Sequence, residues 1–437
     1  MIPQLTNRPG DALVVFGLTG DLGHAELIPG IALLHATGRL DVPVVGVGRT
    51  RPDDVGELVR STLDDTFAAR LGTTVDALVD EMDLRFVGGD ATESDTWEAV
   101  AADLGDVHHP VVYAALPPAL LGDVARTLAA SSLSDTAHLV LEKPFGDDAA
   151  SARALYDEIT DAVDARYLFL VDHFLAKGTI HNLVSMRRTP ILDRSLRREA
   201  IESVAVDFPE ARGLEGRGSF YESVGVIADV VQNHLLQTVA SALCEPVLDR
   251  DDPEAIRASR LELLRSIAPI DPGETVLGQY DGYRDVDDVD PDSQVPTFVD
   301  TVLHADADRW KDVPIRLRTG KCLTPGPFEV TWRFEESVPT VAREARARLQ
   351  PDAAFEIDLA GLDPSTHGTV TTTACAPIDA EHGERDAYAV VLGDALAGSR
   401  RHMSSIDEIV ACWKIVEPIL GTPRDLQTYR RGSRGPS

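Results

Sequence analysis

The first 170 residues alternate short apolar runs with amphipathic stretches, and this rhythm is the strongest constraint on the fold. A five-residue apolar run begins at Ala12, and a helical pattern over residues 149–163 separates two of the later runs. Strands and helices that alternate in this way predict a parallel sheet with helices on both faces. The expected strands are residues 12–16, 42–46, 84–87, 111–116, 138–141 and 167–171.

The pattern changes after Asp172. A long helical stretch over residues 220–242 is followed by loops rich in Asp and Pro and then by short apolar runs that indicate an antiparallel sheet. A chain of 437 residues exceeds what one hydrophobic core usually serves. We therefore predict an α/β domain over residues 1–175 and an α+β domain with a large, mainly antiparallel sheet over residues 176–437. The expected strands of this sheet are residues 298–303, 313–317, 330–334, 355–359 and 370–373.

Composition and charge exclude several classes of protein. The formal net charge of −31 opposes binding to nucleic acid or anionic membranes. No apolar stretch reaches the ~18 residues of a membrane span, and the first ten residues show no signal-peptide pattern, so we expect a cytoplasmic protein. The four cysteines are far apart and form no C-x-x-C pair, which argues against a metal site or disulfides.

The first predicted strand leads directly into a glycine-rich turn and a helical stretch. Glycines at such a turn let the backbone approach a pyrophosphate, and the helix N-terminus offers free N–H groups. This predicts a Rossmann-like dinucleotide-binding domain, although a tight turn that needs positive φ is the alternative explanation. The predicted cofactor-binding residues of the turn are Gly17, Thr19, Gly20, Asp21 and Leu22.

Basic residues follow two other predicted strands of this domain. Arg49 and Arg51 stand after the second strand, where an NAD enzyme would place a carboxylate, so the 2′-phosphate of NADP is favoured; an exposed arginine pair is the alternative. Lys143 follows a later strand at the edge that faces the ligand. The Pro117–Pro118 pair forms either a wall beside the nicotinamide or a helix start.

Two histidine clusters are candidates for the substrate site. His173 and Lys177 are four residues apart and would share one face if a helix begins there, offering two cationic donors to a phosphate. Asp229 and His234 lie on the long helical stretch, where a five-residue separation in an α-helix points them in different directions around one ligand. A solvated surface pair and a satisfied core histidine are the alternatives.

The motifs together resemble the glucose-6-phosphate dehydrogenase family over nearly the whole chain. They occur in the family's order: Gly17-x-x-Gly20-Asp21-Leu22, Tyr113-x-x-Leu116-Pro117-Pro118, Glu142-Lys143-Pro144-Phe145-Gly146, Asp172-His173-Phe174-Leu175-x-Lys177, Gly213-x-x-Gly216-Arg217-Gly218, Asp229-x-x-Gln232-Asn233-His234 and Arg318-Thr319-Gly320-Lys321.

The resemblance implies an activity and a role for each matching residue. The implied reaction is the NADP-dependent oxidation of D-glucose 6-phosphate at C1, which begins the pentose phosphate pathway, in a homodimer or homotetramer. His234 matches the general base and Asp172 the carboxylate that orients it. His173 and Lys177 match the pair that holds the phosphate. The remaining matches are Glu210, Asp229 and Lys321, which contact the sugar, and Lys143, which lies near nicotinamide and substrate.

The chain departs from the family pattern beside the cofactor and the phosphate. The family usually has two or three basic residues after Leu22, whereas this chain reads Gly23-His24-Ala25-Glu26. Phe174 stands where the family more often has tyrosine. These changes keep two alternatives open: the same hydride chemistry on a different hexose phosphate, such as an amino- or deoxy-sugar, and a catalytically silent paralogue that binds sugar phosphate.

Overall fold

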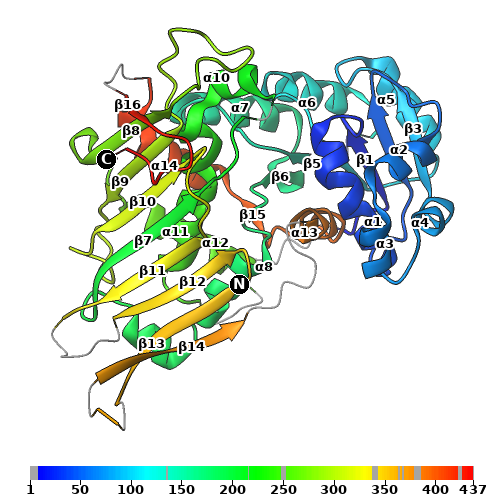
Figure 1. The fold of residues 1–437 in the computed structure, drawn as a ribbon. Coiled ribbons are helices and arrows are strands. Elements are labelled where there is room, and N and C mark those ends of the chain that lie inside the picture. The colour runs from blue at the N-terminus through cyan, green and yellow to red at the C-terminus, as the bar shows by residue number, and fades with distance from the viewer. Residues whose placement is uncertain are drawn as a thin grey trace. The chain divides into compact units, whose positions relative to one another are not determined.

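The computed structural model divides the chain into two compact units (Figure 1). Unit 1 comprises Met1–Gly178 and His382–Ile406, and unit 2 comprises Thr179–Glu381 and Asp407–Ser437. The predicted boundary near residue 175 lies beside the first crossing, but the segment His382–Ile406, which the sequence placed in the second domain, belongs to unit 1. The residues described are 8–133, 136–214, 216–247, 252–336, 343–362, 365–366, 369–377, 385–421 and 426–436.

Unit 1 contains the predicted parallel sheet. Among its described residues, seven strands lie in the order β15-β6-β5-β4-β1-β2-β3, and only β15 runs antiparallel to its neighbour. All five residues of β1 and of β4 are buried, as expected for strands covered on both faces. The strands are β1 (Ala12–Phe16), β2 (Val44–Gly48), β3 (Leu84–Gly88), β4 (Pro110–Ala114), β5 (His138–Leu141), β6 (Leu168–Val171) and β15 (Met403–Ser404).

The returning segment completes unit 1. Its helix α13 packs on α1, where Gly30 allows close approach, because a Cβ at that position would lie 3.2 Å from the backbone nitrogen of Ala389. The unit's helices are η1 (Gly23–Leu27), α1 (Ile28–Ala36), α2 (Val55–Thr62), α3 (Asp65–Arg70), α4 (Val75–Glu81), α5 (Ser94–Leu104), η2 (Pro118–Leu120), α6 (Leu121–Ala130), α7 (Ala149–Ala162), η3 (Ala165–Tyr167) and α13 (Arg385–Leu396).

Unit 2 is built on the predicted large, mainly antiparallel sheet. Nine strands within the described residues lie in the order β14-β13-β12-β11-β7-β10-β9-β8-β16. Two neighbouring pairs, β7 with β10 and β8 with β16, are parallel. The strands are β7 (Ile201–Pro209), β8 (Thr275–Tyr280), β9 (Phe298–Leu303), β10 (Ile315–Gly320), β11 (Phe328–Phe334), β12 (Glu344–Gln350), β13 (Ala354–Leu362), β14 (Thr369–Pro377) and β16 (Gln427–Tyr429).

The long helical stretch expected over residues 220–242 consists of three segments. Gly225 has a φ of 59°, which interrupts the helical backbone, and the next segment is a π-helix. The helices of unit 2 are α8 (Gly178–Met186), α9 (Pro190–Ser195), α10 (Gly218–Val226), η4 (Ile227–Leu235), α11 (Leu236–Leu243), α12 (Pro253–Ser266), η5 (Pro272–Glu274), α14 (Ile406–Val416) and η6 (Glu417–Ile419).

The described part of the chain contains no helix that is both long and apolar enough to cross a bilayer. The four cysteines are free thiols; Cys375 is exposed and the other three are buried.

A buried ion pair joins α12 to α14 in unit 2. The Nε of Arg260 lies 2.9 Å from Oε1 of Glu408, and both side chains are almost completely buried. A second pair between the same helices, Arg265 with Asp407 at 3.2 Å, is largely exposed. The two pairs therefore offer a matched comparison of burial.

We predict that Glu408→Gln lowers the free energy of unfolding by about 3–5 kcal/mol, because it leaves the buried Arg260 charge without its carboxylate. Asp407→Asn should change it by less than about 1 kcal/mol, because the exposed pair is well solvated. Urea unfolding followed by circular dichroism measures both. Equal losses in the two variants would contradict this account.

Candidate active site

The glycine turn after β1 adopts a geometry that excludes side chains. Gly17 has a φ of +82°, and a Cβ there would lie 2.3 Å from the carbonyl oxygen of Ala115. The N–H of Gly20 donates to the Gly17 carbonyl at 2.9 Å, and Asp21 and Leu22 begin the helical turn that continues into η1. Gly17 therefore needs positive φ and also leaves backbone accessible at a helix N-terminus, as a pyrophosphate requires.

Arg49 lies beside this turn, directly after β2. A Cβ on the preceding Gly48 would be 3.0 Å from the hydroxyl of Thr19, so the end of β2 and the turn are in close contact. Arg49 is exposed, and no carboxylate occupies the end of β2. Hydrogen bonds from Thr92 lower the pKa of nearby Asp90, and the Arg49 charge adds to this effect. Glycine backbone and an exposed guanidinium fit a dinucleotide that carries a 2′-phosphate.

Glu142, next to Lys143 at the end of β5, is a buried carboxyl group. The hydroxyl of Tyr113 on β4 donates a hydrogen bond to its Oε1. Burial raises the pKa of Glu142 to about 7, against the lowering effects of Tyr113 and Lys143. Of the neighbouring prolines, Pro118 begins the short helix η2, which agrees with the helix-start interpretation.

The segment after β6 differs from the expected helix. Residues 173–176 form successive turns, and α8 begins only at Gly178, so His173 and Lys177 do not share a helical face. Instead both contact the Phe174 ring: the ammonium of Lys177 lies 3.8 Å from its centroid, and the His173 ring packs edge-on at 5.2 Å. Asp172 is buried, and its Oδ1 accepts the N–H of Phe174.

Tyr388 on α13 lies beside His173, a contact that the sequence analysis did not predict. Its ring stacks on His173 at 5.1 Å, and its hydroxyl lies 3.3 Å from Nδ1 of the same histidine. Burial raises its pKa, and the charges of Glu142, Glu26 and Asp172 add to the shift. The returning segment thus supplies one wall of the His173 environment, and Glu26 is electrostatically coupled to the same group of residues.

In unit 2, the parallel pairing of β7 with β10 brings two predicted residues together. Pro209 is paired with Gly320, so the next residues, Glu210 and Lys321, leave the sheet side by side. The Lys321 ammonium is 2.6 Å from Oε2 of Glu210 and 3.8 Å from Oδ2 of Asp229. Three residues that lie far apart in sequence thus form one charged cluster.

The cluster retains polar atoms that the described residues do not satisfy. Oε1 of Glu210 and the hydroxyl of Tyr221 are buried without a hydrogen-bond partner in the described part of the chain. The Lys321 ammonium lies 5.7 Å from the centroid of the Tyr221 ring. Burial raises the pKa of Glu210, and the Lys321 charge opposes that shift. A polyhydroxylated ligand would supply donors and acceptors for these atoms.

The expectation that Asp229 and His234 point in well-separated directions is wrong. Both belong to the π-helix η4, where hydrogen bonds span five residues, so the two side chains lie about one turn apart on a similar face. His234 is buried, and its backbone N–H donates to Oδ1 of Asn233 at 2.7 Å. The π-helix thus aligns His234 with the Asp229 member of the charged cluster.

These features define a dinucleotide-dependent oxidoreductase with a site for a polar, charged substrate. The chain matches the family model "Glucose-6-phosphate dehydrogenase, NAD binding domain" over residues 14–182 and the model "Glucose-6-phosphate dehydrogenase, C-terminal domain" over residues 186–437. It therefore belongs to the glucose-6-phosphate dehydrogenase family.

Relatives and solved structures of the family match the chain over almost its full length. Glucose-6-phosphate 1-dehydrogenase 1 of Mycobacterium tuberculosis is 32% identical over 98% of this chain and 93% of its own length. A crystal structure of glucose-6-phosphate 1-dehydrogenase from Mycobacterium avium is 31% identical, with a TM-score of 0.86, covering 98% of this chain and 96% of that one. A structure of glucose-6-phosphate dehydrogenase in complex with glucose-6-phosphate is 28% identical, with a TM-score of 0.89, covering 99% and 96%.

The Glu142 carboxyl group predicts a pH dependence of stability. Its folded pKa of about 7 exceeds the ordinary value of 4.5, so the folded state binds more protons and stability falls as pH rises from about 4.5 through 7. The loss above pH 8 is on the order of 3 kcal/mol.

Glu142→Gln should remove this part of the pH dependence, as measured by urea unfolding from pH 5 to pH 8. Glu98→Gln, at an exposed position on α5, is the matched control and should follow the wild-type profile. If the Glu142→Gln and wild-type profiles run parallel, the raised pKa is wrong.

Proposed function

We propose that this protein oxidises D-glucose 6-phosphate at C1 to 6-phosphoglucono-1,5-lactone with NADP as hydride acceptor. Membership of the glucose-6-phosphate dehydrogenase family extends over both units. The observation that carries the proposal is the cluster of Glu210, Asp229 and Lys321. Its charged groups can bind sugar hydroxyls, and one of them, Asp229, lies on the same helix as His234. Bound NADP supplies the nicotinamide carbon that accepts the hydride.

In this proposal His234 is the general base. Oxidation of the hemiacetal releases a hydride from C1 and a proton from the C1 hydroxyl, and the C1–O bond becomes the lactone carbonyl. A neutral imidazole accepts such a proton at neutral pH. We propose that Asp172 orients this imidazole and stabilises its protonated form, as a carboxylate does in other histidine–aspartate pairs.

His173 and Lys177 are the proposed phosphate ligands. Both donate charge-assisted hydrogen bonds when protonated, which are stronger than neutral ones. Phe174 cannot donate the hydroxyl hydrogen bond of the usual tyrosine, but its ring supports the Lys177 ammonium. The phosphate is therefore proposed to rest on two cationic donors held by aromatic rings.

Cofactor binding is assigned to the glycine turn and two basic residues of unit 1. We propose that the backbone at Gly17, Thr19, Gly20, Asp21 and Leu22 binds the pyrophosphate. Arg49 would bind the 2′-phosphate, and Lys143 would contact the nicotinamide end and the substrate.

Glu26 supports a second candidate substrate, an amino-hexose phosphate. Its charge contributes to the raised pKa values of Tyr113 and Tyr388, and Tyr113 donates a hydrogen bond to Glu142, the residue before Lys143. Such a carboxylate favours an ammonium group over a second anion. The absorbance of reduced nicotinamide at 340 nm, measured with glucose 6-phosphate, glucosamine 6-phosphate and 2-deoxyglucose 6-phosphate, separates the candidates. The main proposal requires the highest kcat/KM with glucose 6-phosphate, and turnover with none of them would contradict both.

We also propose a cytoplasmic location and a homodimeric or homotetrameric state. The names of relatives from Arabidopsis thaliana and Solanum tuberosum, which describe cytoplasmic forms, support the location. Light scattering coupled to gel filtration measures the oligomeric state.

The base assignment predicts that His234→Asn lowers kcat by about 10²–10⁴-fold with little change in the affinity for glucose 6-phosphate. His304→Asn makes the same chemical change at an exposed histidine of unit 2 and should leave kcat unaltered. Steady-state kinetics and equilibrium binding measure the two quantities. Wild-type turnover in His234→Asn would remove His234 from the mechanism.

The Arg49 assignment predicts cofactor discrimination. Arg49→Ala should raise the KM for NADP by about 10–100-fold, the equivalent of one lost charge-assisted contact, and should affect NAD much less. Arg70→Ala, an exposed arginine of the same unit, is the matched control. An equal loss for both cofactors would argue against binding of the 2′-phosphate by Arg49.

A further inference from the structure

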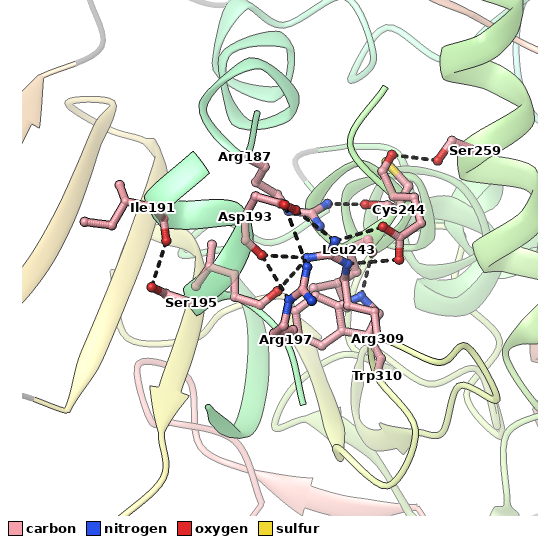
Figure 2. Close-up of polar contacts among 12 residues, drawn as sticks. Arg187, Ile191, Asp193, Ser195, Arg197, Leu243, Cys244, Ser259, Arg309 and Trp310 are labelled. Atoms are coloured by element: carbon pink, nitrogen blue, oxygen red, sulfur yellow. Dashed lines mark hydrogen bonds and ion pairs between the residues drawn. The ribbon is translucent and has the colours of Figure 1, made fainter. Parts of the chain in front are cut away.

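A buried arginine of unit 2 carries hydrogen-bond donors that no described residue accepts. Arg187 directly follows α8 and is only 2% exposed. Its Nη1 donates to the carbonyl oxygen of Cys244 at 2.5 Å, as Figure 2 shows. Its Nε and Nη2 are fully buried and have no hydrogen-bond partner among the described residues. Buried guanidinium nitrogens in that state are strongly destabilising unless an acceptor reaches them.

The two unpaired donors lie on the same edge of the planar guanidinium. Nε–H and Nη2–H project in nearly parallel directions, and this fixed fork is the edge with which arginine binds anions through two hydrogen bonds. Nη1, on the other edge, is already engaged by the Cys244 carbonyl. The Nε–H and Nη2–H donors of Arg187 therefore both remain available for one acceptor inside the protein.

The nearby carboxylates are committed to a different arginine. Glu245 accepts from Nε and Nη2 of Arg309 at 3.0 and 2.8 Å, and Asp193 accepts from Nη2 at 2.8 Å (Figure 2). The Nη1 of Arg309 donates to the carbonyl oxygens of Asp193 and Leu196. The hydrogen-bonding nitrogens of Arg309 are thus satisfied, and among the described residues neither carboxylate accepts a hydrogen bond from Arg187.

Among the five charged residues of this group, guanidinium groups outnumber carboxylates by three to two. The group contains the guanidinium groups of Arg187, Arg197 and Arg309, and the carboxylates of Asp193 and Glu245; Arg197 pairs with Asp193 at 3.7 Å. Burial lowers the pKa of Arg187 and the Arg309 charge adds to that effect, whereas the Glu245 and Asp193 charges oppose it. An arginine nevertheless stays protonated in proteins. Arg187 is the most buried of the three guanidinium groups and has no carboxylate hydrogen-bonded to it among the described residues.

We propose that the Nε and Nη2 edge of Arg187 binds one small monovalent anion, with chloride as the simplest example. A monovalent anion satisfies both donors and brings the charge of the five-residue group to zero. A water molecule would accept the hydrogen bonds but would leave the positive charge uncompensated in a buried place, which is costly.

The location of this site connects it to the proposed catalytic helix. Arg187 is bonded to Cys244, which ends α11, and α11 continues directly from η4 with Asp229 and His234. A bound anion would hold Arg187 against this carbonyl and so stabilise the end of α11. The expected effect is a dependence of unit 2 stability on chloride. This effect does not require the proposed reaction.

Anomalous scattering from crystals of the wild-type protein tests the site directly. Crystals grown with sodium bromide in place of chloride should show a bromine peak beside Nε and Nη2 of Arg187. The peak requires no variant, so the test does not depend on whether a substituted chain folds. A water molecule at this position without a bromine peak would overturn the proposal.

Thermal unfolding gives an independent measurement in solution. At a chloride concentration of about ten times the dissociation constant, the wild-type midpoint should exceed that in sodium gluconate of equal ionic strength by about 3 °C. Arg187→Met should abolish the difference. Arg194→Met, which removes an exposed charge from α9, should retain it. A chloride effect that persists in Arg187→Met, or is missing in the wild type, would contradict the proposal.

Discussion

Parallel pairing of strands is the constraint on which the candidate site depends. Neighbouring parallel strands end at the same edge, so residues that follow them meet without being close in sequence. In unit 1 this edge receives the glycine turn, Arg49, Lys143 and Asp172. In unit 2 the sheet is mainly antiparallel, yet its parallel pair β7–β10 is followed by Glu210 and Lys321. The same physical rule thus positions polar residues in two different architectures.

The fold was largely predictable because its strands bury apolar residues. All six strands expected in unit 1 are present, and the large antiparallel sheet was correct. Four strands of the unit 2 sheet, β7, β8, β12 and β16, were not predicted. Of these, β12 has alternating alanine and arginine rather than branched apolar residues. Its arginines are neutralised by the next strand, where Arg346 bonds to Glu356 and Asp358. Such cross-strand compensation is a tertiary effect and leaves no periodic apolar signal in the sequence.

Some of the predicted site residues do lie together, as Glu210, Asp229 and Lys321 do, but their geometry was not predictable. Motif spacing identified His234 and Asp229, yet their alignment depends on a π-helix, which has no clear signature in residue order. No site role was predicted for Tyr221 or Tyr388, because a buried tyrosine is hard to distinguish from a core residue in sequence; only folding brings them beside Lys321 and His173. No helix begins at His173, because the backbone N–H and C=O groups of residues 172–177 form the hydrogen bonds of consecutive turns instead. Phe174 then holds both cationic side chains through ring contacts.

The return of residues 382–406 to unit 1 affects how the two units can be separated. The chain passes between them three times, so the dinucleotide-binding unit is discontinuous. A fragment that stops at residue 178 would leave the apolar surface of α1 and the edge of β6 uncovered, because α13 and β15 come from the later segment. Limited proteolysis or gene truncation would therefore yield an aggregation-prone piece instead of an autonomous cofactor-binding module.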